Sequence, residues 1–329
     1  MKRKIIKQGH NTLTITLPTK WAKQFNLQAG DEIDLLEKDN GLFLTTERKF
    51  ESLKTEINID DLDIPTIWKY FMAVYREGYD EVKVKFPTDK ELENPYKFFT
   101  QHKPDLRYKK ERGKRRIQES LQGFVNRFIG YEIVEHGKDF IVIKEMGQIT
   151  SKEFDSSLRR IFLIVQQMAE ETLEAIETNN PKILAHMHDV DINLDKFQDY
   201  CIRILNKIGN KETRKTSLLF SILYFLELIG DEFKNISVHI INDFPNIKLN
   251  NVKSLATCVK EQIEAYYDLF YKFNTEKIKK ISEIDQKIYF SFREIYKKTS
   301  EEEKEIFHHL RIIGRYINAL MELKIEMEV

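Results

Sequence analysis

The chain has 329 residues, which is too many for one average domain, so two or three domains are expected. Lys and Arg together number 53, as do Asp and Glu, so the whole chain carries no net charge that would attract nucleic acid or acidic partners. Two cysteines without metal-ligand spacing, no signal-peptide pattern and no apolar stretch long enough for a bilayer favour a reduced, soluble, cytoplasmic protein without membrane insertion.

Residues 1–49 are predicted to form short strands around one helix. Residues 12–17 alternate threonine with apolar side chains, which is typical of a strand with one buried face. Residues 18–27 begin with proline and are followed by glycine, so they have the start and stop signals of a helix. Two further strand patterns flank Asn40-Gly41, a dipeptide typical of hairpin turns. A unit this small buries little apolar surface by itself, so we expect an interwound homodimer.

Basic side chains gather at the start of the chain. The first 23 residues contain six Lys or Arg side chains and no acid, a local concentration that can neutralise DNA phosphates although the whole chain is neutral. His10 and Asn11 lie at a predicted strand connection, where they could reach base edges, although Asn11 is equally suited to a turn. The candidate DNA-binding residues are Arg3, Lys4, Lys7, His10, Lys20 and Lys23.

Residues 3–46 resemble the AbrB/SpoVT/MazE family of swapped-hairpin DNA-binding domains. The positions that carry the resemblance are Gly9, Leu13, Ile15, Leu17, Pro18, Trp21, Leu27, Gly30, Asp31, Asn40 and Gly41. The resemblance implies a DNA-binding dimer with a two-fold axis. Such a dimer matches a palindromic or pseudo-palindromic site on DNA.

Residues 50–148 mix strand and helix patterns and are predicted to form a small α+β domain whose strand order cannot be read from periodicity. The expected strands are residues 54–59, 80–86, 131–136 and 139–145, and the expected helices are residues 65–78 and 115–130. Residues 97–116 hold nine basic side chains against two acids. A mobile surface loop is the simpler interpretation of this run, and binding of polyanions is the alternative.

Residues 149–329 have helical periodicity throughout, and polar punctuation divides them into six segments. The segments form two sets of three, because "LELIGDEFKNI" at residues 226–236 and "LRIIGRYINAL" at residues 310–320 repeat one pattern. The sequence therefore predicts a multidomain fold: a strand-rich domain, a small α+β domain at residues 50–148, and an all-α bundle of two three-helix repeats.

Acidic residues are the one candidate for chemistry, because the sequence has no protease, hydrolase, P-loop or dinucleotide motif. Asp191, Asp195 and Asp199 share one helical face, and Glu227 and Asp231 lie on the next helix. Two facing rows of like charge repel each other. A cation with oxygen ligands would remove this repulsion.

Two readings of these acids stay open. In one, Asp191, Asp195, Glu227 and Asp231 bind a cation, with Asn235 as a supporting polar group and His188 as a less certain ligand. In the other, the solvent and the nearby cations Lys196, Arg203 and Lys234 screen the acids without metal.

The bundle resembles the PhoU family of phosphate-signalling proteins, whose motif is L-E-R-x-G-D-x-x-x-N-I. Leu226, Glu227, Gly230, Asp231, Asn235 and Ile236 match this motif, and Leu228 replaces its basic residue. The segment "DINLD" resembles the acidic partner motif on the preceding helix, which assigns Asp191 and Asp195. The resemblance implies a bound divalent or trivalent metal ion, iron or manganese-like.

The second repeat departs from the motif. Arg311 and Arg315 stand where it has Glu and Asp, and Ile281 precedes Asp285 by one turn. Guanidinium groups cannot ligate a cation, so one metal site at most is expected. The arginines are left to bind an anion, a carboxylate of a partner, or an acid of the chain itself.

Together the two resemblances imply a non-enzymatic, DNA-binding transcriptional regulator of phosphate uptake, similar to archaeal-type PhoU-like regulators. In this interpretation metal or a transport-related partner acts on the bundle and thereby on the spacing of two DNA-binding hairpins. One alternative is an adaptor that does not bind DNA and regulates a phosphate transporter through contacts with its ATPase or with a sensor protein. A carboxylate-bridged metal enzyme is less favoured, because the paired Glu-x-x-His motifs of ferritin-like oxidases are missing.

Overall fold

The protein divides into two compact units, Met1–Ser52 and Leu53–Val329, which are treated separately below. The computed structural model describes residues 2–9, 11–38, 41–45, 52–88, 91–92, 115–147, 149–209, 212–243 and 249–329. Most of the basic run at residues 97–116, together with His10 and Asn40, lies outside these ranges.

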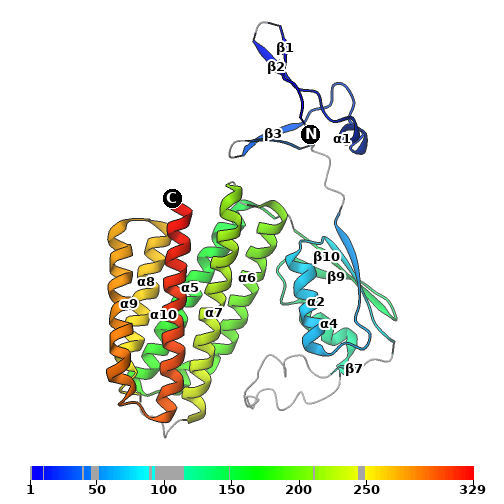
Figure 1. The fold of residues 1–329 in the computed structure, drawn as a ribbon. Helices are drawn as coiled ribbons and strands as arrows, with labels where there is room; N and C mark the ends of the chain where they lie inside the picture. The colour runs from blue at the N-terminus through cyan, green and yellow to red at the C-terminus, as the bar shows by residue number, and fades with distance from the viewer. Residues whose placement is uncertain are drawn as a thin grey trace. The chain divides into compact units, whose positions relative to one another are not determined.

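The N-terminal unit consists of two hairpins and one short helix. Strand β1 (Ile6–Gln8) pairs antiparallel with β2 (Thr12–Thr14), and β3 (Asp34–Lys38) pairs antiparallel with β4 (Gly41–Thr45). Helix α1 (Thr19–Gln24) lies between the hairpins in the chain (Figure 1). The predicted strand-rich character is confirmed. The predicted hairpin of β3 and β4 is also confirmed, but Gly41 lies in β4, where it pairs with Lys38, and not in the turn.

This unit has no core of its own within the described residues. None of the described side chains between residues 2 and 45 is buried. Six apolar side chains of its strands and connections are more than half exposed: Ile5, Ile6, Leu13, Ile15, Leu35 and Leu42, at 51% to 69%. A single copy therefore leaves in water the apolar surface that its alternating strand pattern predicts to be buried.

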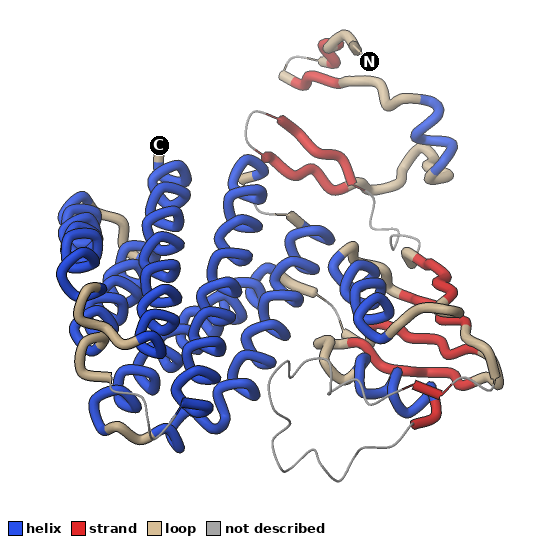
Figure 2. The backbone as a smooth tube through the Cα atoms, turned by 60° about the horizontal axis from the view of Figure 1, so that its bottom comes forward, coloured by secondary structure: helices blue, strands red, loops and turns tan. Residues whose placement is uncertain are grey.

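A four-stranded sheet with two helices on one face forms the first part of the second unit (Figures 1 and 2). The strand order is β5 (Lys54–Asn58), β6 (Glu81–Lys85), β10 (Phe140–Glu145), β9 (Tyr131–His136). Strands β5 and β6 are parallel, and helix α2 (Ile64–Arg76) connects them, as a parallel pair requires a crossover. The other pairs are antiparallel. The two-residue strands β7 (Glu91–Leu92) and β8 (Arg115–Arg116) precede helix α4 (Ile117–Val125).

Aromatic side chains fill the space between these two helices and the sheet. Trp68 stacks on Phe128 with 5.0 Å between ring centroids, and Phe71 lies 5.6 Å from Phe124. The hydroxyl of Tyr75 donates a hydrogen bond to the carbonyl of Ile129. Burial of large rings contributes most of the packing energy of such a small layer. The predicted α+β character of this region is confirmed.

The remainder of the described chain forms a helical bundle, as predicted (Figure 1). Its long helices are α5 (Ser151–Thr178), α6 (Met187–Ile208), α7 (Thr213–Asp243), α8 (Lys253–Tyr271), α9 (Thr275–Tyr296) and α10 (Glu301–Glu328), with a 3-10 helix at Pro181–His186 before α6. Capping boxes start α5 at Thr150 and α10 at Ser300, where the cap side chain and a glutamate three residues later satisfy free backbone amides.

Two sets of three helices build the bundle, which is what the repeated sequence pattern predicts. Within each set consecutive helices pack together, and the sets meet through α5 with α8 and α7 with α10. The glycine of each repeat motif lies at a helix contact. A Cβ at Gly230 would come within 2.1 Å of a methyl group of Leu194, so this glycine lets α6 approach α7 closely.

The sheet layer and the bundle are joined by a buried arginine. The Arg203 side chain of α6 is fully buried, and its guanidinium donates to the carbonyls of Tyr75 and Tyr79 at 2.6 and 2.8 Å and to Glu145 at 3.1 Å. It lies over the rings of Tyr75 and Tyr131. These contacts hold both parts in one compact unit. In the part of the chain that the structure describes, no helix has the length and apolar character needed to cross a membrane.

Candidate functional site

The four carboxylates predicted to bind metal lie at the contact between α6 and α7. Asp191 and Asp195 come from α6, and Glu227 and Asp231 come from α7. The close approach of the two helices at Gly230 brings both pairs together. Asp191 is buried, and the other three are partly buried. We refer to these four residues as the acid cluster.

Two cations pair with the acid cluster. The ammonium of Lys234, on α7, donates to Asp191 at 2.8 Å and also to Asp231. The guanidinium of Arg127, which follows α4, donates to Asp195 at 3.1 Å. Lys234 is one of the counter-ions that the sequence suggests. Arg127 was not predicted, because it lies in the α+β region at residues 50–148 and not in the bundle. Arg76 of α2 is a further cation near the cluster, because its charge opposes the rise in the pKa of Glu227.

Burial and mutual repulsion raise the pKa values of three carboxyls of the cluster. Burial, together with the neighbouring Asp231 and Asp191 carboxylates, raises the pKa of Glu227 to about 7. Burial also raises the pKa of Asp191, and burial with the Asp191 charge raises the pKa of Asp195 well above its ordinary value. Conversely, the Asp191 and Asp231 carboxylates outweigh burial and raise the pKa of Lys234. The cluster therefore favours added positive charge, as a proton or a cation.

The cluster offers oxygen ligands of the kind that hard cations prefer. Atom Oδ1 of Asp191 is buried and has no hydrogen-bond partner, so one carboxylate oxygen is available inside the cluster. The ligands are not preassembled, however. Among the described residues, no three carboxylates of the cluster bring oxygen atoms within 4.8 Å of one another. A cation would have to draw the carboxylates inward and displace Lys234.

The other residues named with this site have different roles. Arg203 does not screen the acid cluster, and this expectation is wrong, because its guanidinium pairs with Glu145 on the sheet side of α6. Burial, together with the nearby ammonium charge of Lys234, lowers the pKa of the His188 imidazole. No contact of Asn235 identifies it as a ligand, so its supporting role stays a prediction.

A cavity of about 300 Å³ adjoins the cluster where α2 meets the bundle; it is lined by Trp68, Met72, Arg76, Asp195, Gln198, Asp199, Tyr224 and Glu227. At its wall Arg76 donates to Asp199 at 2.6 Å, to the hydroxyl of Tyr224 at 2.7 Å and to Gln198 at 3.1 Å. Asp199, which shares a face with the predicted ligands, is therefore committed to an ion pair. Sequence reasoning missed Arg76, because nothing in a helix-terminal arginine indicates a partner in another domain.

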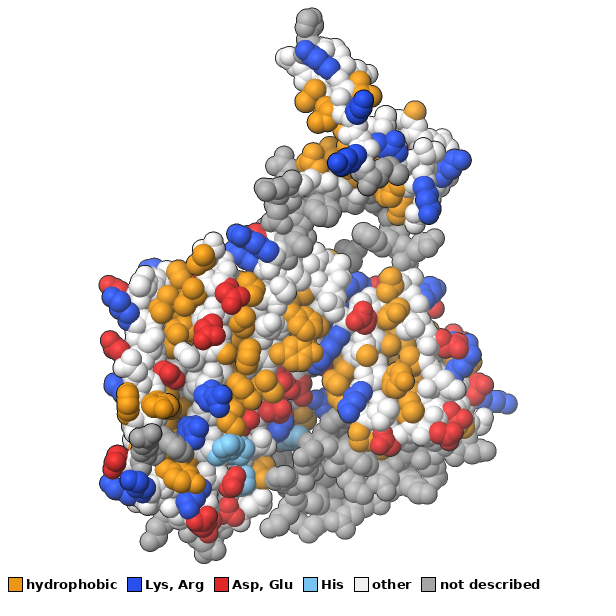
Figure 3. Space-filling view, viewed as in Figure 1, with side chains coloured by type: hydrophobic (Ala, Val, Ile, Leu, Met, Phe, Trp, Pro, Cys, Tyr) orange, Lys and Arg blue, Asp and Glu red, His pale blue; other side chains and the backbone are white. Residues whose placement is uncertain are grey.

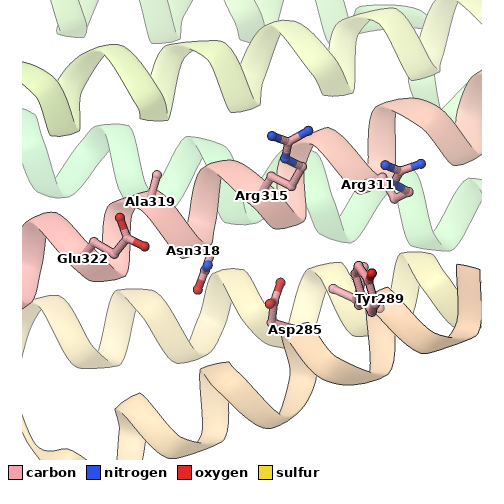
Figure 4. Close-up of a pocket in the computed structure, with 8 residues that line it drawn as sticks. Asp285, Tyr289, Arg311, Arg315, Asn318, Ala319 and Glu322 are labelled. Carbon is pink, nitrogen blue, oxygen red and sulfur yellow. The ribbon is translucent and has the colours of Figure 1, made fainter.

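The second repeat has a different pocket at the corresponding place, with a volume of about 600 Å³. Figure 4 shows Asp285 of α9 and Asn318 of α10 projecting into the space between these two helices, with Arg311 and Arg315 on the same helix as Asn318. Ile281, where the first repeat has an acid, is fully buried. The lining also includes Glu322, so the pocket combines two carboxylates with two guanidinium groups. That this repeat binds no second cation stays a prediction.

The predicted DNA-binding cations of the N-terminal unit are all on its surface. Arg3 and Lys4 precede β1, Lys7 lies in β1, and Lys20 and Lys23 lie in α1. All five side chains are exposed. Figure 3 shows Lys and Arg side chains spread over this unit. The sixth candidate, His10, lies outside the described residues.

Two parts of the chain match known protein families. Residues 6–52 match the family described as antidote-toxin recognition MazE, bacterial antitoxin. Residues 158–240 match the PhoU domain family. The chain carries a MazE-type domain followed by a PhoU domain. Both resemblances seen in the sequence are thereby confirmed, and the PhoU match covers most of α5, all of α6 and most of α7, which contain the acid cluster.

A solved structure and the curated proteins complete the comparison. The crystal structure of the phosphate transport system regulatory protein PhoU from Streptococcus pneumoniae is 16% identical, with a TM-score of 0.47, over 54% of this chain and 94% of that one. No curated protein matches the chain.

Proposed function

We propose that the protein is a dimeric, DNA-binding transcriptional regulator of phosphate uptake. The observation that supports this best is the presence of a MazE-type domain and a PhoU domain in one chain. The first supplies the DNA-binding dimer, and the second supplies the link to phosphate regulation. Neither family description names a catalytic activity, so a regulatory role is proposed rather than an enzymatic one.

The exposed apolar side chains of the N-terminal unit support the dimer. Leu13 of β2 is 69% exposed and Leu35 of β3 is 61% exposed. Apolar area removed from water contributes about 25 cal/mol per Å², so a second copy that covers these strands gains a core that one copy lacks. We therefore assign residues 1–52 as the dimer interface.

Replacing Leu35 with Glu should dissociate the dimer, because a carboxylate would have to enter the shared core without a partner. Analytical ultracentrifugation of the full chain is expected to give a dimer for the natural sequence and a monomer for Leu35→Glu. The matched control is Leu163→Glu, a leucine of α5 that is 42% exposed. A dimer that persists in Leu35→Glu and is lost in Leu163→Glu would place the interface in the bundle instead.

Replacing both Lys4 and Lys7 with Ala should weaken binding to duplex DNA of any sequence. Each phosphate contact that is lost should reduce the slope of log K against log salt by roughly one unit, because fewer counterions are released. Fluorescence anisotropy with labelled duplex across a salt series measures this slope. Replacing the exposed Lys279 and Lys280 of α9 is the control and should leave the slope unchanged.

The same titration separates the two candidate functions. If the natural chain binds no DNA even at low salt, the N-terminal unit serves dimerisation alone. The protein would then act as an adaptor for a phosphate transporter or a sensor protein. If the lysine variant still binds DNA with an unchanged slope, the DNA contacts lie elsewhere than at Lys4 and Lys7.

We further propose that the acid cluster is the input site of the bundle, with a hard divalent or trivalent cation as its ligand. The excess of negative charge, the raised pKa of Glu227 and the unpartnered oxygen of Asp191 support this proposal. Arg127 connects the cluster to the sheet layer, and β5 of that layer directly follows residues 1–52 in the chain.

A further inference from the structure

A second group of potential metal ligands lies further along α7 than the acid cluster, where this helix packs against α10. His239 comes from α7, and Glu305 and His309 come from α10. One ligand atom from each of the three side chains lies within 4.8 Å of the other two, and among the described residues no other set of His, Cys, Asp and Glu meets this criterion. None of the three belongs to the acid cluster.

The spacing along the two helices explains why the side chains meet. Glu305 and His309 are four residues apart and so share one face of α10. Glu232 and His239 are seven residues apart, two turns along one face of α7. These faces oppose each other at the contact between the two three-helix sets.

One imidazole is already oriented for a metal. Atom Nδ1 of His309 lies 2.5 Å from Oε2 of Glu232, and both side chains are 14% exposed. With the carboxylate accepting from Nδ1, the lone pair of Nε2 is left for an ion. This arrangement of carboxylate, histidine and ion recurs in metal proteins and fixes the tautomer and direction of the ring. The ring of His239 lies 5.5 Å from that of His309.

We propose that His239, Glu305 and His309 bind a borderline divalent cation of the zinc type, with Glu232 as a positioning residue for His309. Two imidazoles and one carboxylate suit zinc, cobalt or nickel, whereas magnesium and calcium prefer sites of oxygen alone. Ligand atoms around a tetrahedral zinc ion lie about 3.3 Å apart, given bonds of about 2.0 Å. The three side chains need to close by about 1.5 Å at most, which changes of rotamer can provide.

The position of the site defines what a bound ion would do. Helix α7 belongs to the first three-helix set and α10 to the second, so the ion would link the two sets. When the two repeats are aligned at Gly230 and Gly314, the positions equivalent to Glu305 and His309 are Ser221 and Phe225. The site is therefore not a copy of the acid cluster. Glu305 is exposed and both histidines are partly exposed, so an ion can enter from solvent. Figure 3 shows histidine side chains at the surface of the bundle.

The test is titration of the chelator-treated full chain with cobalt(II), followed by competition with zinc. A tetrahedral site with two nitrogen ligands should give visible absorption bands that saturate at one ion per chain and disappear when zinc is added. Glu305→Gln, at an exposed position where the fold is not at risk, and His309→Gln should each reduce the affinity at least tenfold. Glu232→Gln should reduce it about 10–100-fold, as other changes to groups that orient metal ligands do.

The control variant is His308→Ala, because this exposed histidine neighbours the group without belonging to it. It should keep the cobalt spectrum and the affinity of the natural chain. The proposal is overturned if no cobalt bands appear, or if they persist in Glu305→Gln and His309→Gln. It is also overturned if the bands are lost only in Glu227→Gln with Asp231→Asn, since cobalt would then occupy the acid cluster.

Discussion

Replacing Arg203 with Leu is expected to lower the free energy of unfolding of the unit at residues 53–329 by about 3–5 kcal/mol. The guanidinium is fully buried, and its removal leaves the carboxylate of Glu145, which is 10% exposed, without this partner. The carbonyls of Tyr75 and Tyr79 also lose their donor. Lys207 also pairs with Glu145, so this carboxylate keeps one cationic partner and the loss of stability is limited. Urea denaturation followed by circular dichroism measures the change.

Two comparisons separate the buried ion pair from a general effect of removing an arginine. Arg214→Leu, at a side chain that is 73% exposed, should change the free energy by less than about 0.5 kcal/mol. Glu145→Leu combined with Arg203→Leu should recover part of the loss, because neither charge is then buried alone. A loss below about 1 kcal/mol for Arg203→Leu would show that Arg203 does not hold the sheet layer to the bundle.

The helices of the bundle were predictable because their signals are local. Polar punctuation ends each helix, apolar spacing marks each buried face, and the pattern around Gly230 and Gly314 reveals the repeat. The acid cluster followed from the same local rule, since residues four apart share a face. The structure adds the reason why two faces meet there, which is the absence of a side chain at Gly230.

Contacts between distant parts of the chain were not predictable. Arg127 and Asp195 are 68 residues apart, and Arg76 and Asp199 are 123 residues apart. Each arginine ends or follows a helix in a region with its own local pattern, and no spacing rule relates it to an acid in another domain. The order of the sheet has the same cause, because strand periodicity fixes which face is buried but not which strands are neighbours.

The histidine group was missed for a related reason. Its ligands come from two helices that belong to different repeats, and Glu305 lies in a run of acids that is typical of a solvated helix start. Resemblance to a family also directed attention to the motif positions, and His239 and His309 lie outside them. Only the packing of α7 on α10 shows that these side chains converge.

Replacing Glu227 with Gln should stabilise the metal-free protein at pH 8. The pKa of Glu227 is about 7 in the folded chain against an ordinary value of 4.5, so between these values the folded state holds a proton that the unfolded state releases. Stability therefore falls as the pH rises from 4.5 through 7, by about 3 kcal/mol for a shift of this size. The uncharged Gln avoids that loss, so the two proteins should differ at pH 8 and agree near pH 4.5. Thermal melting with chelator present checks this, with the exposed Glu283→Gln as the control.

A cation at the acid cluster should remove the same loss by supplying the missing charge. At pH 8, manganese(II) at a hundredfold excess over Kd should stabilise the natural chain by about 2.7 kcal/mol. Glu227→Gln combined with Asp231→Asn should abolish this gain, whereas His239→Ala, which disables the other site, should keep it. The second repeat is an internal comparison, because Arg311 and Arg315 stand there in place of Glu227 and Asp231. If manganese, iron and magnesium all leave the melting temperature of the natural chain unchanged, Lys234 and Arg127 are the counter-ions of the cluster and the cation assignment is wrong.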